Sequence, residues 1–398
     1  MTSTAYRIER SVNRWLTTPE SNAAGRLGLY RIIYALAALI YVLPPSQYRQ
    51  IALIPDFLWR PVLATLWLKS PPSMTFLTAV ECFYIGSLVL LLVGLCVRLM
   101  TLIVLISGTL FTAILYSFGK LDHSDTFMRV YLPVVMLFSP WGATYSLDAV
   151  LRQRRGQLPP AVSADSLRYS WPFLFLFWWL CIMFSVGGIT KAIPPGQWIV
   201  DLNTLSKIMK EANLVLNPSI LRHQFSELPI VPTLVLWMGL AFELSYPLAV
   251  INKNWRRFYL SSTIFFHMGT FLTLGIRFTF MLPFYIIFFD LYGLYARFFP
   301  KRLWILPSRF FARWSSPMLV GGSMLLAVVT VMSHYVIALK PIFRLPIIAL
   351  ENYGWYLAII LAVYGPATSL PKMLAGLRGK TVQSKVNIDS LISSETAL

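Results

Sequence analysis

One lysine stands at the end of a long apolar run, where its amine could do chemistry. Lys191 follows two adjacent glycines, Gly187 and Gly188. Glycines let another backbone or a ligand approach closely, and an ammonium deprived of water more readily becomes a neutral amine. A neutral amine can act as a base or a nucleophile, so Lys191 is a candidate catalytic residue. The alternative is a structural lysine that extends from its helix end to the membrane interface.

Further ionisable side chains lie in or beside apolar runs. Glu243 and His267 fall well inside two such runs, where they either hydrogen-bond to hold helices together or take part in a reaction. His123 belongs to a charged segment that leads to Arg129, and for both residues a functional and a structural role remain open. Arg277, between two apolar runs, either binds an anion or ends a helix. Glu81 and His334 are also ionisable and lie within apolar runs, and we assign them no role.

The composition indicates that lipid surrounds these side chains. Of the 398 residues, 57% are hydrophobic and only 13% are charged, which is too few charges for the surface of a soluble domain. The net charge of +18 comes mainly from Lys and Arg between apolar segments, so it indicates topology and contact with membrane lipids, and no nucleic acid. The three cysteines all fall inside apolar runs and predict neither a disulfide framework nor a metal site.

The elements that must position the candidate residues are transmembrane helices. A hydrocarbon core of about 30 Å is crossed by roughly 20 apolar residues, and we count about ten runs of that length. Pro133 and a turn at 139–142 interrupt the fourth run, while Gly354 and Pro366 interrupt the last, so we expect an all-α, polytopic transmembrane bundle of about eight to ten helices. The runs cover residues 25–43, 74–96, 99–118, 128–151, 170–192, 231–251, 257–275, 278–299, 318–339 and 352–369.

The distribution of Lys and Arg predicts the orientation. Most of them fall on one side when the N-terminus is placed inside, so we expect both termini in the cytoplasm. Residues 1–24 form an amphipathic segment and predict an interfacial helix, residues 192–229 predict a re-entrant or interfacial lid on the outer side, and the polar tail 381–398 predicts disorder.

Several short motifs, taken in order, resemble the HTTM superfamily, the membrane module shared by vitamin K-dependent gamma-carboxylase and many bacterial proteins. The resemblance covers roughly residues 15–300 and defines an HTTM-like domain at 25–300, followed by additional helices at 301–380. The motifs are GRLGLYR at 25–31, VGLCVR at 93–98, the outer loop at 123–124, SPWG at 139–142, SLD at 146–148, GGITK at 187–191, GQW at 196–198, and the stretches 243–247 and 266–267.

The resemblance implies a helical bundle in the bacterial inner (plasma) membrane with carboxylase- or oxidase-like chemistry on a quinone or lipid at the outer leaflet. In the carboxylases a lysine at the position of Lys191 deprotonates vitamin K hydroquinone so that O2 can attack. Carried over, Lys191 is the base, and His123 and His267 orient quinone oxygens or stabilise an alkoxide. We add Glu243, Arg129 and Arg277 as candidate substrate-binding residues. The implied reduced quinone is therefore a lipid-soluble substrate or cofactor.

Two departures from the carboxylases leave other functions open. This chain has two apolar segments and a short tail in place of the large extramembrane domain that holds a peptide, and it has Thr190 before Lys191 where the carboxylases have a second lysine. We therefore do not expect carboxylation of a peptide substrate. The alternatives to an enzyme are a non-catalytic membrane component for peptide maturation or export, and a transporter, although clear inverted repeats are not evident.

Overall fold

The computed structural model describes residues 20, 22–42, 51–119, 126–157, 167–193, 203–215, 220–228, 230–274, 281–288, 315–335 and single positions between 363 and 374. The regular structure in these ranges is helical throughout. The predicted N-terminal amphipathic helix, the tail 381–398, His123 and Arg277 lie outside the described residues. The chain forms two compact units, which we call unit 1 (177–277, with 1–17 and 355–398) and unit 2 (18–176 and 278–354).

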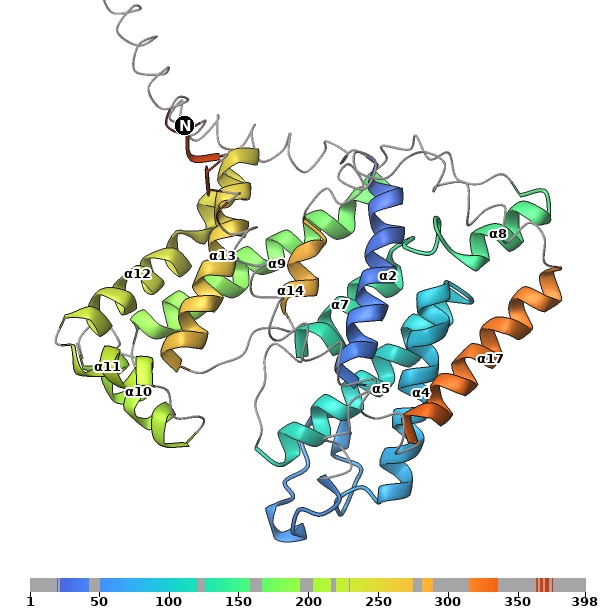
Figure 1. Cartoon of the computed structure of the whole chain (residues 1–398), viewed down its shortest axis with the longest axis horizontal. Helices are drawn as coiled ribbons and strands as arrows, with labels where there is room; N and C mark the ends of the chain where they lie inside the picture. The colour runs from blue at the N-terminus through green and yellow to red at the C-terminus, as the bar shows by residue number, and fades with distance from the viewer. Residues whose placement is uncertain are drawn as a thin grey trace, which may run out of the picture. The chain divides into compact units, whose positions relative to one another are not determined.

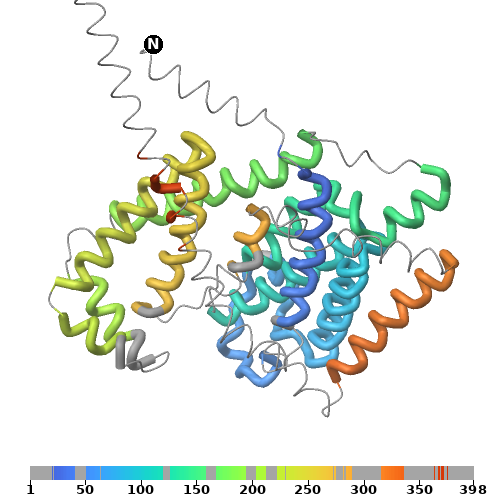
Figure 2. Tube along the Cα trace, turned by 45° about the horizontal axis from the view of Figure 1, so that its top comes forward, coloured from blue at the N-terminus to red at the C-terminus, as the bar shows by residue number. Residues whose placement is uncertain are grey.

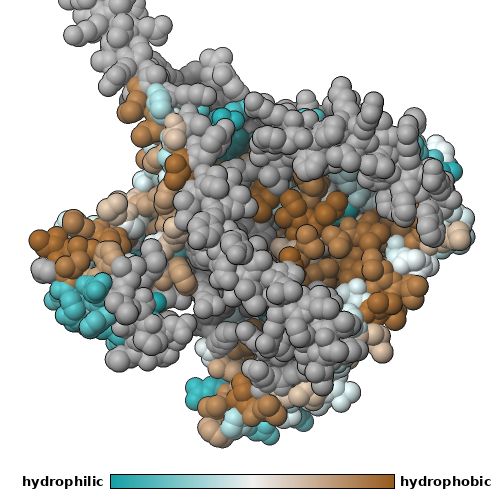
Figure 3. Space-filling view, viewed as in Figure 1, coloured by the Kyte–Doolittle hydropathy of each residue, from teal (hydrophilic) through white to brown (hydrophobic). Residues whose placement is uncertain are grey.

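Six described helices are long and apolar enough to cross a membrane, which makes this an all-α, multi-pass membrane protein (Figure 1). They match six of the predicted apolar runs. The apolar side chains of such helices can contact lipid as well as the protein interior. Figure 3 shows apolar residues gathered over the last of these helices, α17. The six are α2 (Ala23–Val42), α4 (Met74–Val93), α5 (Val97–Ser117), α9 (Leu167–Ala192), α12 (Val231–Ser245) with η4 (Tyr246–Val250), and α17 (Ser316–Tyr335).

The predicted fourth span, 128–151, is not a single helix. A π-helical turn (Phe127–Tyr131) leads into α7 (Leu132–Phe138), which ends at Ser139, and α8 (Leu147–Arg154) begins only after an irregular turn. The physical reason is local, because Pro140 cannot continue the helical hydrogen bonding and Ser146 caps α8 by accepting a hydrogen bond from the Ala149 N–H at 3.0 Å.

In unit 2, α4 and α5 lie side by side, as both views of the backbone show, and α17 lies along α4 (Figures 1 and 2). Polar groups join α17 to α4. The Nε2 atom of His334 is 3.3 Å from Oε1 of Glu81, and the hydroxyl of Tyr335 donates to the other carboxylate oxygen at 3.1 Å. Because both members of the His–Glu pair are buried, each supplies the polar partner that the other needs in lipid. The remaining short elements of this unit are η1 (Asp56–Leu58), η2 (Leu63–Thr65) and α14 (Leu282–Ile286).

Unit 1 contains the C-terminal part of α9 with α12, η4 and α13 (Lys253–Leu274), joined by two short helices. The predicted lid contains α10 (Thr204–Val215) and α11 (Ile220–Glu227), which Ser206 links by donating to the Ser226 carbonyl at 2.8 Å. Leu205 and Met209 of α10 are buried against Leu236 of α12. These two helices therefore form a hairpin that packs on α12 of the same unit.

Candidate functional site

Lys191 in the last turn of α9 forms an ion pair with Glu243 of α12. The two partners differ in exposure, since the lysine side chain is 32% exposed and the carboxylate only 6%. The sequence placed these residues in separate helices and left open whether Glu243 pairs with His267. In the structure the carboxylate pairs with the amine, so Lys191 does more than reach for the interface.

The two glycines before Lys191 let α12 approach α9. A Cβ atom on Gly188 would lie 3.0 Å from Cδ2 of Leu244 and 3.1 Å from Cβ of Glu243, which is closer than side chains normally pack. A Cβ atom on Gly187 would meet nothing nearer than 3.8 Å. Gly188 therefore brings the helices together at the level of the ion pair, as small residues do between membrane helices.

Planar aromatic rings surround the ion pair on one side. Phe184 stacks on Tyr246 with ring centroids 4.4 Å apart, and Phe242 stacks on Phe266 at 5.3 Å. The Lys191 ammonium lies 6.0 Å from the centroid of the Phe266 ring, within the range of a cation–π interaction. The amine thus lies at the edge of a packed group of aromatic rings, with the Phe266 ring at cation–π distance.

His267 of α13 belongs to the same cluster. His267 is 8% exposed, and the centroid of its ring lies 6.1 Å from that of Phe184 and 5.7 Å from that of Phe266. Since Phe184 is on α9, two helices contribute to its surroundings. Unit 1 therefore gathers an amine, a carboxylate and an imidazole around one group of rings.

This combination can move protons and can bind a planar molecule. The carboxylate can hold the proton of the ammonium, the amine can then accept a proton from an acidic hydroxyl, and the imidazole can donate or accept a hydrogen bond. A purely structural role, in which the Lys–Glu pair only holds two membrane helices together, would also explain this contact. The partial exposure of Lys191 gives an incoming molecule a way to reach the amine.

The other predicted site residues belong to unit 2 or lie outside the described residues. Arg129 is in unit 2, where it is buried in the π-helical turn, and Gly108 of α5 packs on it so closely that a Cβ would lie 2.5 Å from its carbonyl oxygen. His123 and Arg277 fall among the residues not described. Within the described residues, no group of three or more His, Cys, Asp or Glu side chains comes together as a metal site would require.

A buried arginine to which the sequence assigned no individual role, Arg31 of the GRLGLYR motif, organises unit 2. Arg31 of α2 is 0% exposed, and its guanidinium donates to the carbonyls of Trp141, Thr144 and Tyr145 in the turn between α7 and α8. An arginine inside an apolar run was the available signal, but only its three acceptors reveal its role.

Asp148 completes this arrangement at the start of α5. Its two carboxylate oxygens accept hydrogen bonds from the N–H groups of Cys96 and Val97, both at 2.8 Å. The turn before it is held by Arg31, and a Cβ on Gly94 would lie 2.9 Å from the Arg31 guanidinium carbon. Four of the motifs behind the HTTM resemblance, those around residues 31, 94, 141 and 148, therefore meet at one place in unit 2.

Comparison with known proteins returned no family model, no curated protein and no solved structure that matches this chain. The resemblance to the HTTM superfamily rests on the motifs quoted above.

Proposed function

We propose that this chain is an HTTM-like protein of the bacterial inner membrane that oxidises a lipid-soluble hydroquinone, with Lys191 as the base. The observation that carries the proposal is the pairing of a partly exposed amine with the buried Glu243 carboxylate beside aromatic rings. Hydroquinones are planar, apolar and weakly acidic, so each feature of the cluster has a counterpart in the ligand.

The chemistry needs the amine in its neutral form. In an apolar setting the ionised pair loses much of its advantage over the neutral pair, because both charges are poorly solvated. Lys191 then gives its proton to Glu243 and accepts the proton of a hydroquinone hydroxyl, while His267 hydrogen-bonds to a ring oxygen. The hydroquinone supplies two electrons and two protons, and O2 accepts them, so that one quinone and one hydrogen peroxide form.

The proposed topology has both termini in the cytoplasm and the site towards the outer leaflet. Arg168 lies in the first turn of α9 and Lys191 in the last, so these residues occupy opposite ends of one membrane-spanning helix. More Lys and Arg lie in the segments on the side of Arg168 than in the predicted lid and outer loops. The positive-inside bias therefore favours the cytoplasmic side for Arg168. Lys191 is then reached from the outer leaflet, where a lipid-soluble molecule can diffuse sideways to it.

The test uses the full-length protein in lipid nanodiscs with a reduced naphthoquinone and O2. We expect formation of quinone and hydrogen peroxide, and we expect Lys191→Met and Glu243→Gln to lower the rate by about a hundredfold or more. Lys253→Met, at the start of α13, is the matched control and should keep its activity.

Two results count against the enzyme. If the folded protein oxidises no hydroquinone above the rate in empty nanodiscs, or if Lys191→Met keeps the full rate, the amine is not a catalytic base. The pair would then be a structural contact, and a component for peptide maturation or export, or a transporter, would be the better description.

A further inference from the structure

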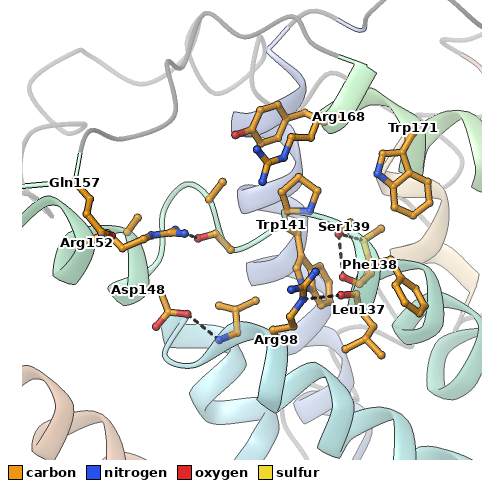
Figure 4. Close-up of a pocket in the computed structure, with 17 residues that line it drawn as sticks. Arg98, Leu137, Phe138, Ser139, Trp141, Asp148, Arg152, Gln157, Arg168 and Trp171 are labelled. Carbon is orange, nitrogen blue, oxygen red and sulfur yellow. Dashed lines mark hydrogen bonds between the residues drawn. The ribbon is translucent and has the colours of Figure 1, made fainter.

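Unit 2 contains a cavity of about 490 Å³ whose wall includes three arginines. Arg98 comes from the first turn of α5, Arg152 from the last turn of α8 and Arg168 from the first turn of α9. Figure 4 shows these three side chains reaching the same hollow from different elements. The residues that line the cavity all belong to unit 2, whereas the residues of the Lys191 cluster belong to unit 1.

Backbone carbonyls hold two of the arginines in place and leave their charge unneutralised. Nε of Arg98 donates to the Leu137 carbonyl at 3.5 Å, and Nη2 of Arg152 donates to the Gly142 carbonyl at 3.0 Å (Figure 4). Each guanidinium keeps further N–H donors beyond these bonds. Such fixed forks match the oxygens of a phosphate group.

The carboxylate in the wall, Asp148, offsets only part of this positive charge. Both oxygens of Asp148 are taken up by the N–H groups of Cys96 and Val97. Among the ion pairs that the described residues form, none joins Asp148 to an arginine of the cavity. With three arginines and one carboxylate, the wall keeps a net charge of +2 towards an incoming anion.

The surroundings indicate a lipid as the source of that anion. The cavity lies where α5 and α9 begin and α7 ends, which is the level of a membrane surface for apolar helices. Phe138 at the end of α7 is 66% exposed, and Trp171 also lines the cavity. An aromatic border beside basic groups suits the junction between a headgroup and its acyl chains, and a soluble phosphate would gain nothing from it.

We propose that this cavity binds the phosphodiester headgroup of an anionic phospholipid, with Arg98, Arg152 and Arg168 around the phosphate and the acyl chains passing Phe138 and Trp171. The inference does not depend on the reaction proposed for Lys191, because it concerns other residues in the other unit. It also does not depend on which side of the membrane is cytoplasmic.

The most informative variant is Arg168→Gln, because no hydrogen bond or ion pair of this side chain is found within the described residues, so its loss should leave the fold intact. The matched control is Arg155→Gln, which removes an equal exposed charge just after α8 but outside the cavity wall. Arg154 is less suitable as a control because it donates to Ser316 at 3.1 Å.

The experiment is native mass spectrometry of the full-length protein in a neutral detergent, titrated with phosphatidylglycerol or with phosphatidylcholine. We expect phosphatidylglycerol to bind at least about tenfold more tightly than phosphatidylcholine, and Arg168→Gln to remove about tenfold of that preference. Arg155→Gln should stay within about twofold of the unchanged protein, since exposed charges outside the cavity are screened. Arg168→Lys should recover part of the loss.

Three outcomes would overturn the proposal. The two lipids could bind equally, or Arg155→Gln could weaken binding as much as Arg168→Gln, which would indicate a diffuse charge effect. Alternatively, millimolar inorganic phosphate or glycerol 3-phosphate could displace phosphatidylglycerol, which would assign the cavity to a soluble phosphate compound. A negative result in the lipid-binding experiment would say nothing about oxidation of a hydroquinone, so the two proposals can fail separately.

Discussion

The ion pair between Lys191 and Glu243 joins a partly exposed amine of α9 to a buried carboxylate of α12. Because of this difference in exposure, removing one partner of the pair costs more stability than removing the other. When Glu243 is removed, the ammonium can still turn towards water. When Lys191 is removed, the carboxylate stays in the protein interior without its cation, which is the more costly state.

We therefore expect Lys191→Met to lower the free energy of unfolding by about 3 kcal/mol and Glu243→Gln by about 1 kcal/mol. Combining the two substitutions should recover stability relative to Lys191→Met alone, because no charge is then left unpaired. Thermal unfolding of the four proteins in one detergent measures these differences. Equal losses for both single variants would show that the exposures do not govern the pair.

The adjacent glycines of α9 provide a second comparison. A Cβ at Gly188 meets Leu244 at 3.0 Å, whereas a Cβ at Gly187 meets nothing nearer than 3.8 Å. We expect Gly188→Ala to destabilise the protein by about 1 kcal/mol and Gly188→Val by more, while Gly187→Ala is neutral or stabilising because alanine favours the helix. The midpoint of thermal unfolding reports all three effects, and a larger loss from Gly187→Ala than from Gly188→Ala would contradict the close contact between α9 and α12 at Gly188.

Arg31 is the basis of a third prediction. Its guanidinium donates to three carbonyls of one turn, and a lysine ammonium cannot adopt the planar fork that reaches them. Arg31→Lys should therefore cost about 2 to 3 kcal/mol even though the charge is kept. Arg155→Lys is the control for a surface position. If Arg31→Lys unfolds at the same temperature as the unchanged protein, the turn does not depend on these bonds.

Cys96 tests both the topology and the electrostatics of the connection between α4 and α5. Partial burial of the thiol, and secondarily the negative charge of Asp148, raise the pKa of Cys96 above its ordinary value. A raised pKa leaves less thiolate at neutral pH, so a membrane-impermeant maleimide should label Cys96 more slowly than a free thiol. The labelling rate should rise by about tenfold per pH unit, and this rise should continue to a higher pH than for a free thiol.

The labelling uses a variant in which Cys82 and Cys181 are alanine, so that Cys96 is the remaining cysteine. With the proposed orientation, the reagent labels inside-out membrane vesicles and leaves intact cells unlabelled. Labelling of intact cells would invert the topology and move Lys191 to the cytoplasmic side.

The fold class could be predicted from the sequence because lipid imposes a simple rule. A segment that crosses hydrocarbon must satisfy its backbone hydrogen bonds internally and carry apolar side chains, so length and hydropathy alone locate helices such as α4 and α5. The same rule marked Glu81, Glu243, His267 and His334 as unusual, since ionisable groups are rare at that depth.

The partners of these groups were decided only by the tertiary structure. Hydropathy reports depth along a helix and not rotation about its axis or the choice of neighbour, so the sequence could not tell whether Glu243 faces Lys191, or that Glu81 lies 3.3 Å from His334. The turn that interrupts the predicted fourth span is marked locally by its prolines, but the donor to its carbonyls is Arg31, more than a hundred residues away, and only the tertiary structure shows this. Local patterns cannot encode a contact whose donor comes from another helix.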